Sequence, residues 1–241
     1  MPRLRRLAAA LSLLALAGSL SAQLAEKGPL LLEENFQRHA TYTKERLPLQ
    51  PGWTVRVAHG QWTRSADGVR STWETGHSPV LVLEGEFGDV IIELEFRYRA
   101  EPGKWAACRL SPTNQVLNPR AYAASIWANV DFKSRAIGLV LEHDEWSPGH
   151  ITQVSRKLAE FAPDTWHTLR LELIGDRALA ASGGITVHGA HEKFALPKTS
   201  LWLGTGQSPH ELRRLRIYAA RPNPALQPAP ARPAGPPAPS R

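Results

Sequence analysis

The stretch DVIIELEFRYR, residues 89–99, decides the fold class of this 241-residue chain. Read alternately, it has an apolar face and a charged face. The apolar face holds Val90, Ile92, Leu94, Phe96 and Tyr98, and the other face holds Ile91, Glu93, Glu95, Arg97 and Arg99. Successive side chains of a β-strand point to opposite sides, so this period of two predicts a strand with one buried face. Burial explains the apolar face, but it does not explain the role of the charged side chains on the other face.

Short apolar runs separated by turns continue along the chain from residue 53 to residue 218. Breaks such as Asp67-Gly68, Glu101-Pro102-Gly103 and Ser182-Gly183-Gly184 separate many of them. About eleven or more short strands in one domain predict an all-β fold, either a sandwich or a barrel. Residues Val154–Phe161 are the exception, and we expect a short helix there.

The two ends of the chain have a different composition from its centre. Residues 1–22 carry three arginines, then an apolar run, then small residues, which is the pattern of a secretory signal peptide cleaved near Ala22. This segment is too short and wrongly flanked for a membrane span, and a buried N-terminal helix is the alternative. Residues 221–241 are rich in proline and alanine and predict an extended tail, either a spacer or a solvated end. We therefore expect a secreted or periplasmic protein.

The charge of the chain lies mainly in these ends. The formal net charge is +7, of which the signal contributes three arginines and the tail three more without any acids. Residues 23–220 are therefore near +1, which argues against nucleic acid as a partner. Cys108 is the single cysteine, so an internal disulfide is excluded, and zinc-finger, P-loop and GxSxG patterns are absent from the sequence.

Five segments, in order, resemble one known family. They read WTVRVAHGQWTRSADGVR, FGDVIIELEFRYR, PDTWHTLRLELIGDRALA, GAHEKFALPKTSLWLGT and LRRLRIYAA. Their order is similar to that of the 3-keto-disaccharide hydrolase domain family, in its exported planctomycete-type members. The resemblance covers about residues 29–220 and implies a single concanavalin A-like jelly-roll sandwich of two antiparallel sheets. Two segments depart from the family pattern, AEPGKWAACRLSP and AIGLVLEHDEW, and these departures affect the region in which the family carries site residues.

The reaction that the resemblance implies needs a base and a cation. A ketone at C3 of a glycoside acidifies the C2 hydrogen, so abstraction of that proton permits elimination at C1 and later addition of water. Glu95 and Arg97 are the candidates for the general base and the enolate stabiliser. The alternative for the whole charged face is a ladder of cross-strand ion pairs on an ordinary solvated sheet. A glucanase mechanism is less favoured, because no third carboxylate follows Glu93 and Glu95 at the required spacing.

A second ionisable cluster is LEHDEWSPGH, residues 141–150, with Glu142 and His143 as further catalytic candidates. Histidine suits acid–base work near neutral pH, and the carboxylates fit a divalent cation. A polar loop at a strand end is the alternative. The spacing predicts no defined metal site, and the sequence requires no cofactor.

The candidate sugar-binding residues are Glu93, Trp105, Arg109 and Trp127. A flat indole ring can pack on the C–H face of a sugar, while charged side chains bond its hydroxyls. Two functions follow as alternatives: a hydrolase of sugar derivatives, and a lectin-like carbohydrate-binding module without catalysis. A structural domain of the cell envelope is the third.

Overall fold

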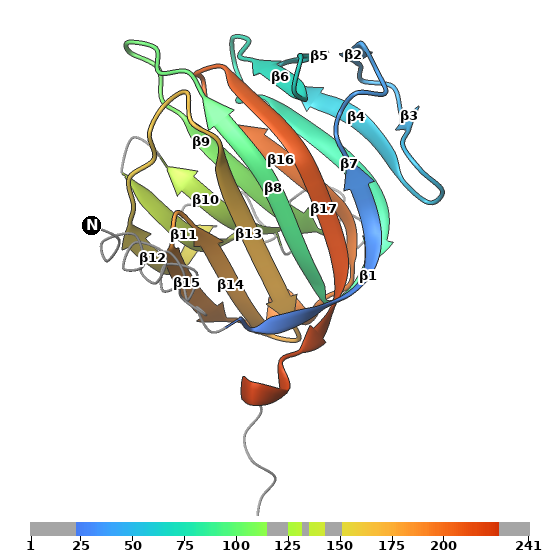
Figure 1. Cartoon of the computed structure of the whole chain (residues 1–241), viewed down its shortest axis with the longest axis vertical. Coiled ribbons are helices and arrows are strands. Elements are labelled where there is room, and N and C mark those ends of the chain that lie inside the picture. The colour runs from blue at the N-terminus through green and yellow to red at the C-terminus, as the bar shows by residue number, and fades with distance from the viewer. Residues whose placement is uncertain (1–22, 115–124, 132–134, 143–150, 227–241) are drawn as a thin grey trace, which may run out of the picture.

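The computed structural model describes residues 23–114, 125–131, 135–142 and 151–226, and these form a sandwich of two antiparallel β-sheets (Figure 1). The nine-stranded sheet contains, in spatial order, β15 (Ile185–Ala190), β14 (Arg177–Ser182), β13 (His167–Ile174), β8 (Val90–Tyr98), β17 (His210–Pro222), β6 (Val69–Thr72), β5 (Gln61–Arg64) and β2 (Thr41–Tyr42), and β1 (Ala25–Glu34) also pairs with β17.

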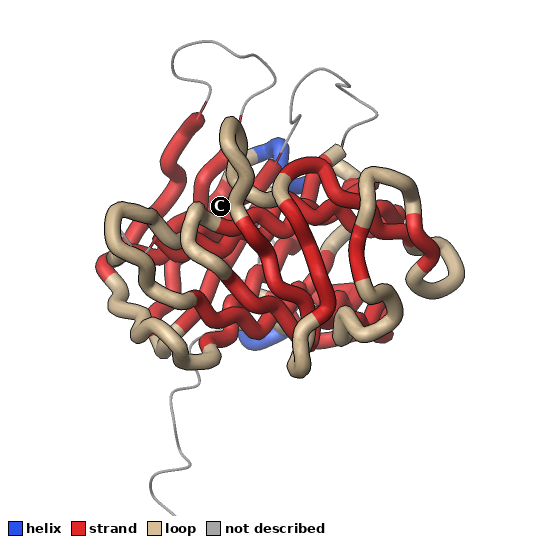
Figure 2. The backbone as a smooth tube through the Cα atoms, turned by 90° about the horizontal axis from the view of Figure 1, so that it is seen from above, coloured by secondary structure: helices blue, strands red, loops and turns tan. Residues whose placement is uncertain are grey.

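The eight-stranded sheet contains β12 (Ile151–Leu158), β11 (Ala136–Glu142), β10 (Ser125–Asp131), β9 (Ala107–Thr113), β16 (Lys198–Thr205), β7 (Val80–Phe87), β4 (Thr54–His59) and β3 (Leu47–Pro48). Two short 3₁₀ helices, Glu192–Ala195 and Pro224–Leu226, complete the described elements, and Figure 2 shows how little of the chain is helical. The expected all-β jelly-roll sandwich is confirmed.

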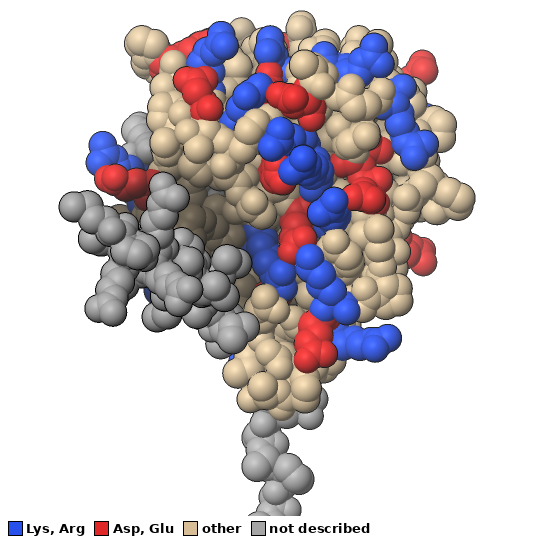
Figure 3. All heavy atoms as spheres, in the orientation of Figure 1, with Lys and Arg blue, Asp and Glu red and all other residues tan. Residues whose placement is uncertain are grey.

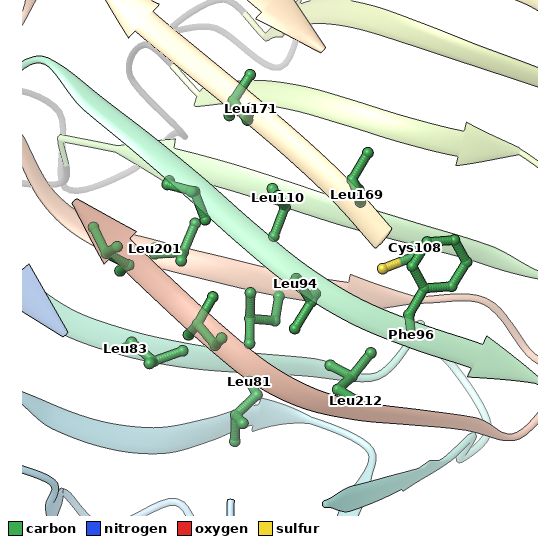
Figure 4. Close-up of a cluster of buried hydrophobic side chains, with 14 of the residues drawn as sticks. Leu81, Leu83, Leu94, Phe96, Cys108, Leu110, Leu169, Leu171, Leu201 and Leu212 are labelled. Atoms are coloured by element: carbon green, nitrogen blue, oxygen red, sulfur yellow. The ribbon is translucent and has the colours of Figure 1, made fainter. Parts of the chain in front are cut away.

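Strand β8 lies at the centre of the nine-stranded sheet, between β13 and β17. Its apolar face is buried as predicted, with Val90, Ile92, Leu94 and Phe96 fully inaccessible to solvent. These side chains meet leucines of the eight-stranded sheet, such as Leu83, Leu110 and Leu201, in one continuous core (Figure 4). Burial of this alternating face between two layers holds the sheets together.

Residues Val154–Phe161 do not form the expected helix. Strand β12 runs to Leu158 and pairs with β11 along its whole length. The spacing of the apolar residues fits one face of a helix, but the hydrogen bonds offered by the open edge of β11 favour the extended form.

A bulge interrupts β17 where it passes the charged end of β8. The register with β8 shifts between Arg213 and Arg216, and Arg214 takes a left-handed backbone angle, φ 48°. An extra residue in one strand turns neighbouring side chains to the same side of the sheet. Both Arg213 and Arg214 therefore reach one carboxylate of β8.

The first and last described strands lie side by side. Ala25 is opposite Pro222 in the β1–β17 pair, and the Asn223 side-chain amide donates to the Gln23 carbonyl at 2.8 Å. Within the described residues, no helix is long and apolar enough to cross a membrane.

Candidate functional site

The charged face of β8 forms a ladder of ion pairs on the outer surface of the nine-stranded sheet. Glu93 accepts hydrogen bonds from Lys27 and Arg170, each at 2.8 Å. Across the strands, residues directly opposite one another carry opposite charges: Glu95 faces Arg213, and Arg97 faces Glu211. Figure 3 shows the charged side chains gathered in a band over β8 and β17. Opposite charges at facing positions stabilise neighbouring strands.

Glu95 is held by two arginines. Its carboxylate accepts from Arg213 Nε at 2.6 Å and from Arg214 Nη1 at 3.0 Å. Burial would raise the pKa of Glu95, but the hydrogen bonds from the two guanidinium groups outweigh it and hold this pKa below its ordinary value. A general base for work near neutral pH needs a raised pKa and an open oxygen, so this environment suits a structural carboxylate better.

Arg97 is engaged in the same way. Its Nε donates to Glu211 at 2.7 Å, and its guanidinium lies 4.6 Å from the ring centre of Trp166. The Arg213 guanidinium also lies on Trp166, at 3.9 Å. The indole of Trp166 therefore packs against two cations, an arrangement that stabilises both. No local pattern in the sequence predicts this contact, because the three residues are far apart along the chain.

Three other predicted residues belong to the opposite sheet. Arg109 lies on β9, Trp127 on β10 and Glu142 at the end of β11, all in the eight-stranded sheet. The register pairs Arg109 with Asn129 and Trp127 with Val140, and Arg109, half-buried next to the buried Leu110, lies on the face away from the core. The structure thus does not bring Glu95 and Arg97 together with Glu142 in one sheet. His143 lies outside the described residues.

Trp105 is fixed at the end of the sandwich, just before β9. The preceding turn places Gly103 at φ 75°, and Ser208 donates its backbone N–H to the Trp105 carbonyl at 3.0 Å. The Arg109 guanidinium lies 5.7 Å from the centre of the Trp105 ring. Trp105 and Arg109, predicted separately as sugar-binding residues, are therefore neighbours.

Trp105 lines a hollow of about 450 Å³, which we call the Trp105 hollow. Its other lining residues come from the end of β8, the β8–β9 loop and the β16–β17 loop: Tyr98, Ala100, Glu101, Gly103, Lys104, Ala106 and Ser208. Lys104 and Glu101 form an ion pair of 2.6 Å at its edge. A half-buried indole with charged groups beside it is the chemistry that recognises a sugar ring and its hydroxyls.

A second hollow of about 350 Å³ lies at the same end of the molecule, on the nine-stranded sheet. We call it the arginine hollow, because Arg70, Arg97 and Arg99 line it with Thr72, Tyr98, Asp164, Pro209 and Glu211. Glu211 accepts from Arg70 Nη2 at 2.6 Å and from Arg97. Burial would raise the pKa of Glu211, yet hydrogen bonds from both arginines hold it below its ordinary value.

Sequence reasoning missed Glu211 and Arg70. In HELRRLRIY, residues 210–218, Glu211 and Arg213 alternate with Leu212, and this pattern predicts a second strand with a charged face. The local pattern does not indicate which strand it pairs with. No group of three or more potential metal ligands occurs among the residues that the structure describes. The ionisable cluster at residues 143–150 lies outside the described residues.

Comparison with solved structures identifies similar folds. The laminarinase from Rhodothermus marinus aligns over 83% of this chain and all of its own, with 14% identity and a TM-score of 0.58. The carbohydrate binding module CBM66 from Bacillus subtilis aligns over 69% of this chain and 95% of its own, with 13% identity and a TM-score of 0.53. A Bacillus subtilis protein of unknown function with a galectin-like fold aligns over 83% of this chain, with a TM-score of 0.57.

Neither a scan of protein-family models nor a search of curated proteins gave a match. The resemblance to the 3-keto-disaccharide hydrolase family therefore rests on sequence motifs alone. The fold, in contrast, is supported by the structure and its comparisons. This chain is a jelly-roll β-sandwich of the kind found in these glucanase, carbohydrate-module and galectin-like structures.

Proposed function

We propose that this protein binds carbohydrate in the Trp105 hollow. One observation carries the proposal: the Trp105 ring lines an open hollow of about 450 Å³, with the Arg109 guanidinium 5.7 Å from its centre. The indole supplies a flat apolar surface, and Glu101, Lys104 and Arg109 supply charged groups for hydroxyl recognition. The similar structures include a carbohydrate binding module and a laminarinase, and these support the same ligand class.

Binding rather than catalysis is the function that the described residues support best. The carboxylates of Glu95 and Glu211 are both engaged by arginines, with pKa values held low. A ligand-binding site needs no titrating base, whereas a hydrolase does. Residues 1–22 and their signal-like pattern support a setting outside the cytoplasm, where extracellular glycans would be met.

Calorimetric titration with neutral glucan oligosaccharides tests this proposal. Trp105→Ala should weaken binding at least about tenfold, because removal of a central aromatic contact costs more than about 1.4 kcal/mol. Trp166→Phe is the matched control, since Trp166 packs against Arg97 and Arg213 on the other sheet. Equal affinity of Trp105→Ala and the wild type would refute the assignment of this hollow.

The second candidate is hydrolysis of 3-keto-glycosides, in line with the sequence motifs. The observation in its favour is that Glu142 ends a strand of the same sheet that carries Arg109. The register puts Glu142 at the other end of that sheet from Trp105, because Ala107 lies opposite Asp131 whereas Glu142 lies opposite Ser125, so a catalytic site at Glu142 would be separate from the Trp105 hollow. Release of free sugar from a panel of 3-keto-glycosides, with and without EDTA, tests the activity and any need for a divalent cation. Unaltered substrate in every reaction would leave the binding function alone.

A further inference from the structure

We propose that the arginine hollow binds a sulfate or carboxylate group of the carbohydrate held in the Trp105 hollow. The natural ligand is then an acidic polysaccharide. This inference rests on the proposed carbohydrate-binding function and adds the chemical class of the ligand.

The arginine hollow has more donors than its own carboxylates use. Arg70 donates to Glu211 from Nε at 3.1 Å and from Nη2 at 2.6 Å, and Arg97 donates to Glu211 from Nε at 2.7 Å. The Nη2 of Arg97 also contacts Glu211 and donates to Asp67 at 3.4 Å. Each guanidinium has five N–H groups, so these contacts occupy only part of each one. Glu211 orients two arginines side by side without saturating them, and the third arginine, Arg99, adds a further positive charge.

Arg99 is the side chain best placed to meet an incoming anion. Its Nε lies 4.0 Å from Asp164, beyond hydrogen-bond distance, and both side chains are over two-thirds exposed. Its backbone is fixed, because its N–H donates to the Pro209 carbonyl at 3.0 Å. A sulfate or carboxylate would offer Arg99 the bidentate geometry that Asp164 does not provide.

The two hollows adjoin. Tyr98 lines both of them, and the consecutive residues Ser208 and Pro209 line one each. At about 3.3 Å per residue along a strand, Arg97 and Ala100 are about 10 Å apart. A sugar polymer lying across the end of β8 can therefore place one ring on Trp105 and an acidic substituent beside the arginines.

The experiment compares three forms of one glucan oligosaccharide by calorimetry: neutral, sulfated, and oxidised at C6 to the uronate. We expect the wild type to bind one acidic form at least about tenfold more tightly than the neutral form. Arg99→Gln should abolish that preference and leave the affinity for the neutral form unchanged. Comparison of the sulfated and oxidised forms identifies which anion the hollow accepts.

Arg135→Gln is the matched control for general charge. Arg135 is as exposed as Arg99, 72% against 73%, pairs with Glu160, and lines neither the arginine hollow nor the Trp105 hollow. An equal loss of acidic preference in both variants would overturn the site, as would equal binding of acidic and neutral forms by the wild type. In either case Trp105-dependent binding of the neutral form would still support the proposed function. If neither form bound, both proposals would fall. Acidic binding that depended on Arg99 but not on Trp105 would support the arginine hollow alone.

Discussion

At the scale of single residues, the environment of Glu95 decides what this carboxylate does. The bulge at Arg214 lets two consecutive arginines donate to it. A glutamate can serve as a general base in an enzyme when its pKa is raised. The pKa of Glu95 is lowered instead, so this carboxylate is better suited to ion pairing between strands. Identity of a residue on a strand face therefore says less about its role than the partners it meets.

Glu95→Gln should lower the free energy of unfolding at pH 7 by about 1–2 kcal/mol, since two charge-assisted hydrogen bonds are lost from a partly exposed site. Urea denaturation measures this difference. The pKa of Glu95 is lower in the folded state, so its contribution is present above the ordinary value of 4.5 and is lost as the pH falls below it. The gap between the two proteins should therefore shrink at pH 3.

Glu160→Gln is the control, because Glu160 is exposed and its ion pair with Arg135 should contribute less than about 1 kcal/mol. A Glu95→Gln protein as stable as the wild type at neutral pH would mean that the ladder contributes nothing measurable.

At the scale of elements, one glycine couples the β16–β17 loop to the Trp105 hollow. A Cβ at Gly206 would lie 2.6 Å from the Trp105 carbonyl oxygen and 2.7 Å from the Ala106 Cα. Both are backbone atoms, so the segment around Trp105 must move if this glycine is replaced.

Gly206→Ala should therefore weaken carbohydrate binding through displacement of Trp105, as well as lower the melting temperature by a few degrees. Gly88→Ala serves as the control, since a Cβ there meets nothing within 4 Å. Calorimetry and thermal unfolding of both variants check the effect. Full binding by a folded Gly206→Ala protein would contradict the coupling.

The strands also show which features of the fold can be predicted from the sequence. The period of two predicts both faces of β8 correctly from Ile92 to Tyr98, because alternation reports burial directly, whereas Ile91 on the charged face is fully buried as well. The alternation of apolar and polar residues does not indicate which strands pair with each other. It therefore gives no indication that Glu95 and Arg109 lie on opposite sheets, which is decided by long-range pairing. Strand β12 was misread as a helix for a related reason, since its partner β11 decides its form.

At the scale of the whole molecule, a buried histidine makes the sandwich sensitive to mild acid. His210 is 1% exposed, and burial lowers its pKa to about 4 from 6.5. Below pH 6.5 the unfolded chain takes up a proton that the folded chain refuses, so stability falls as the pH drops from 6.5 to about 4. Glu34 acts in the opposite direction, because burial raises its pKa.

The free energy of unfolding should decrease by about 3 kcal/mol between pH 7 and pH 4 through His210. Urea denaturation across this range measures the decrease, and His210→Gln should flatten it while it lowers stability at pH 7. A wild-type profile without slope above pH 4.5 would contradict the assignment.

The pairing of β1 with β17 has a mechanical consequence. Residues 23 and 223 meet at one pole of the sandwich. Trp105 and Arg99 lie at the opposite pole, beyond the end of β8, where Tyr98 faces His210 of β17. A tether attached at residue 23 or at residue 223 would pull along the strands, away from any polymer held at the opposite pole (Figure 1). A force between such a tether and the opposite pole would then act as shear along the β8–β17 pair. In shear the hydrogen bonds between the two strands carry the force together, whereas a force across the strands would break them one at a time.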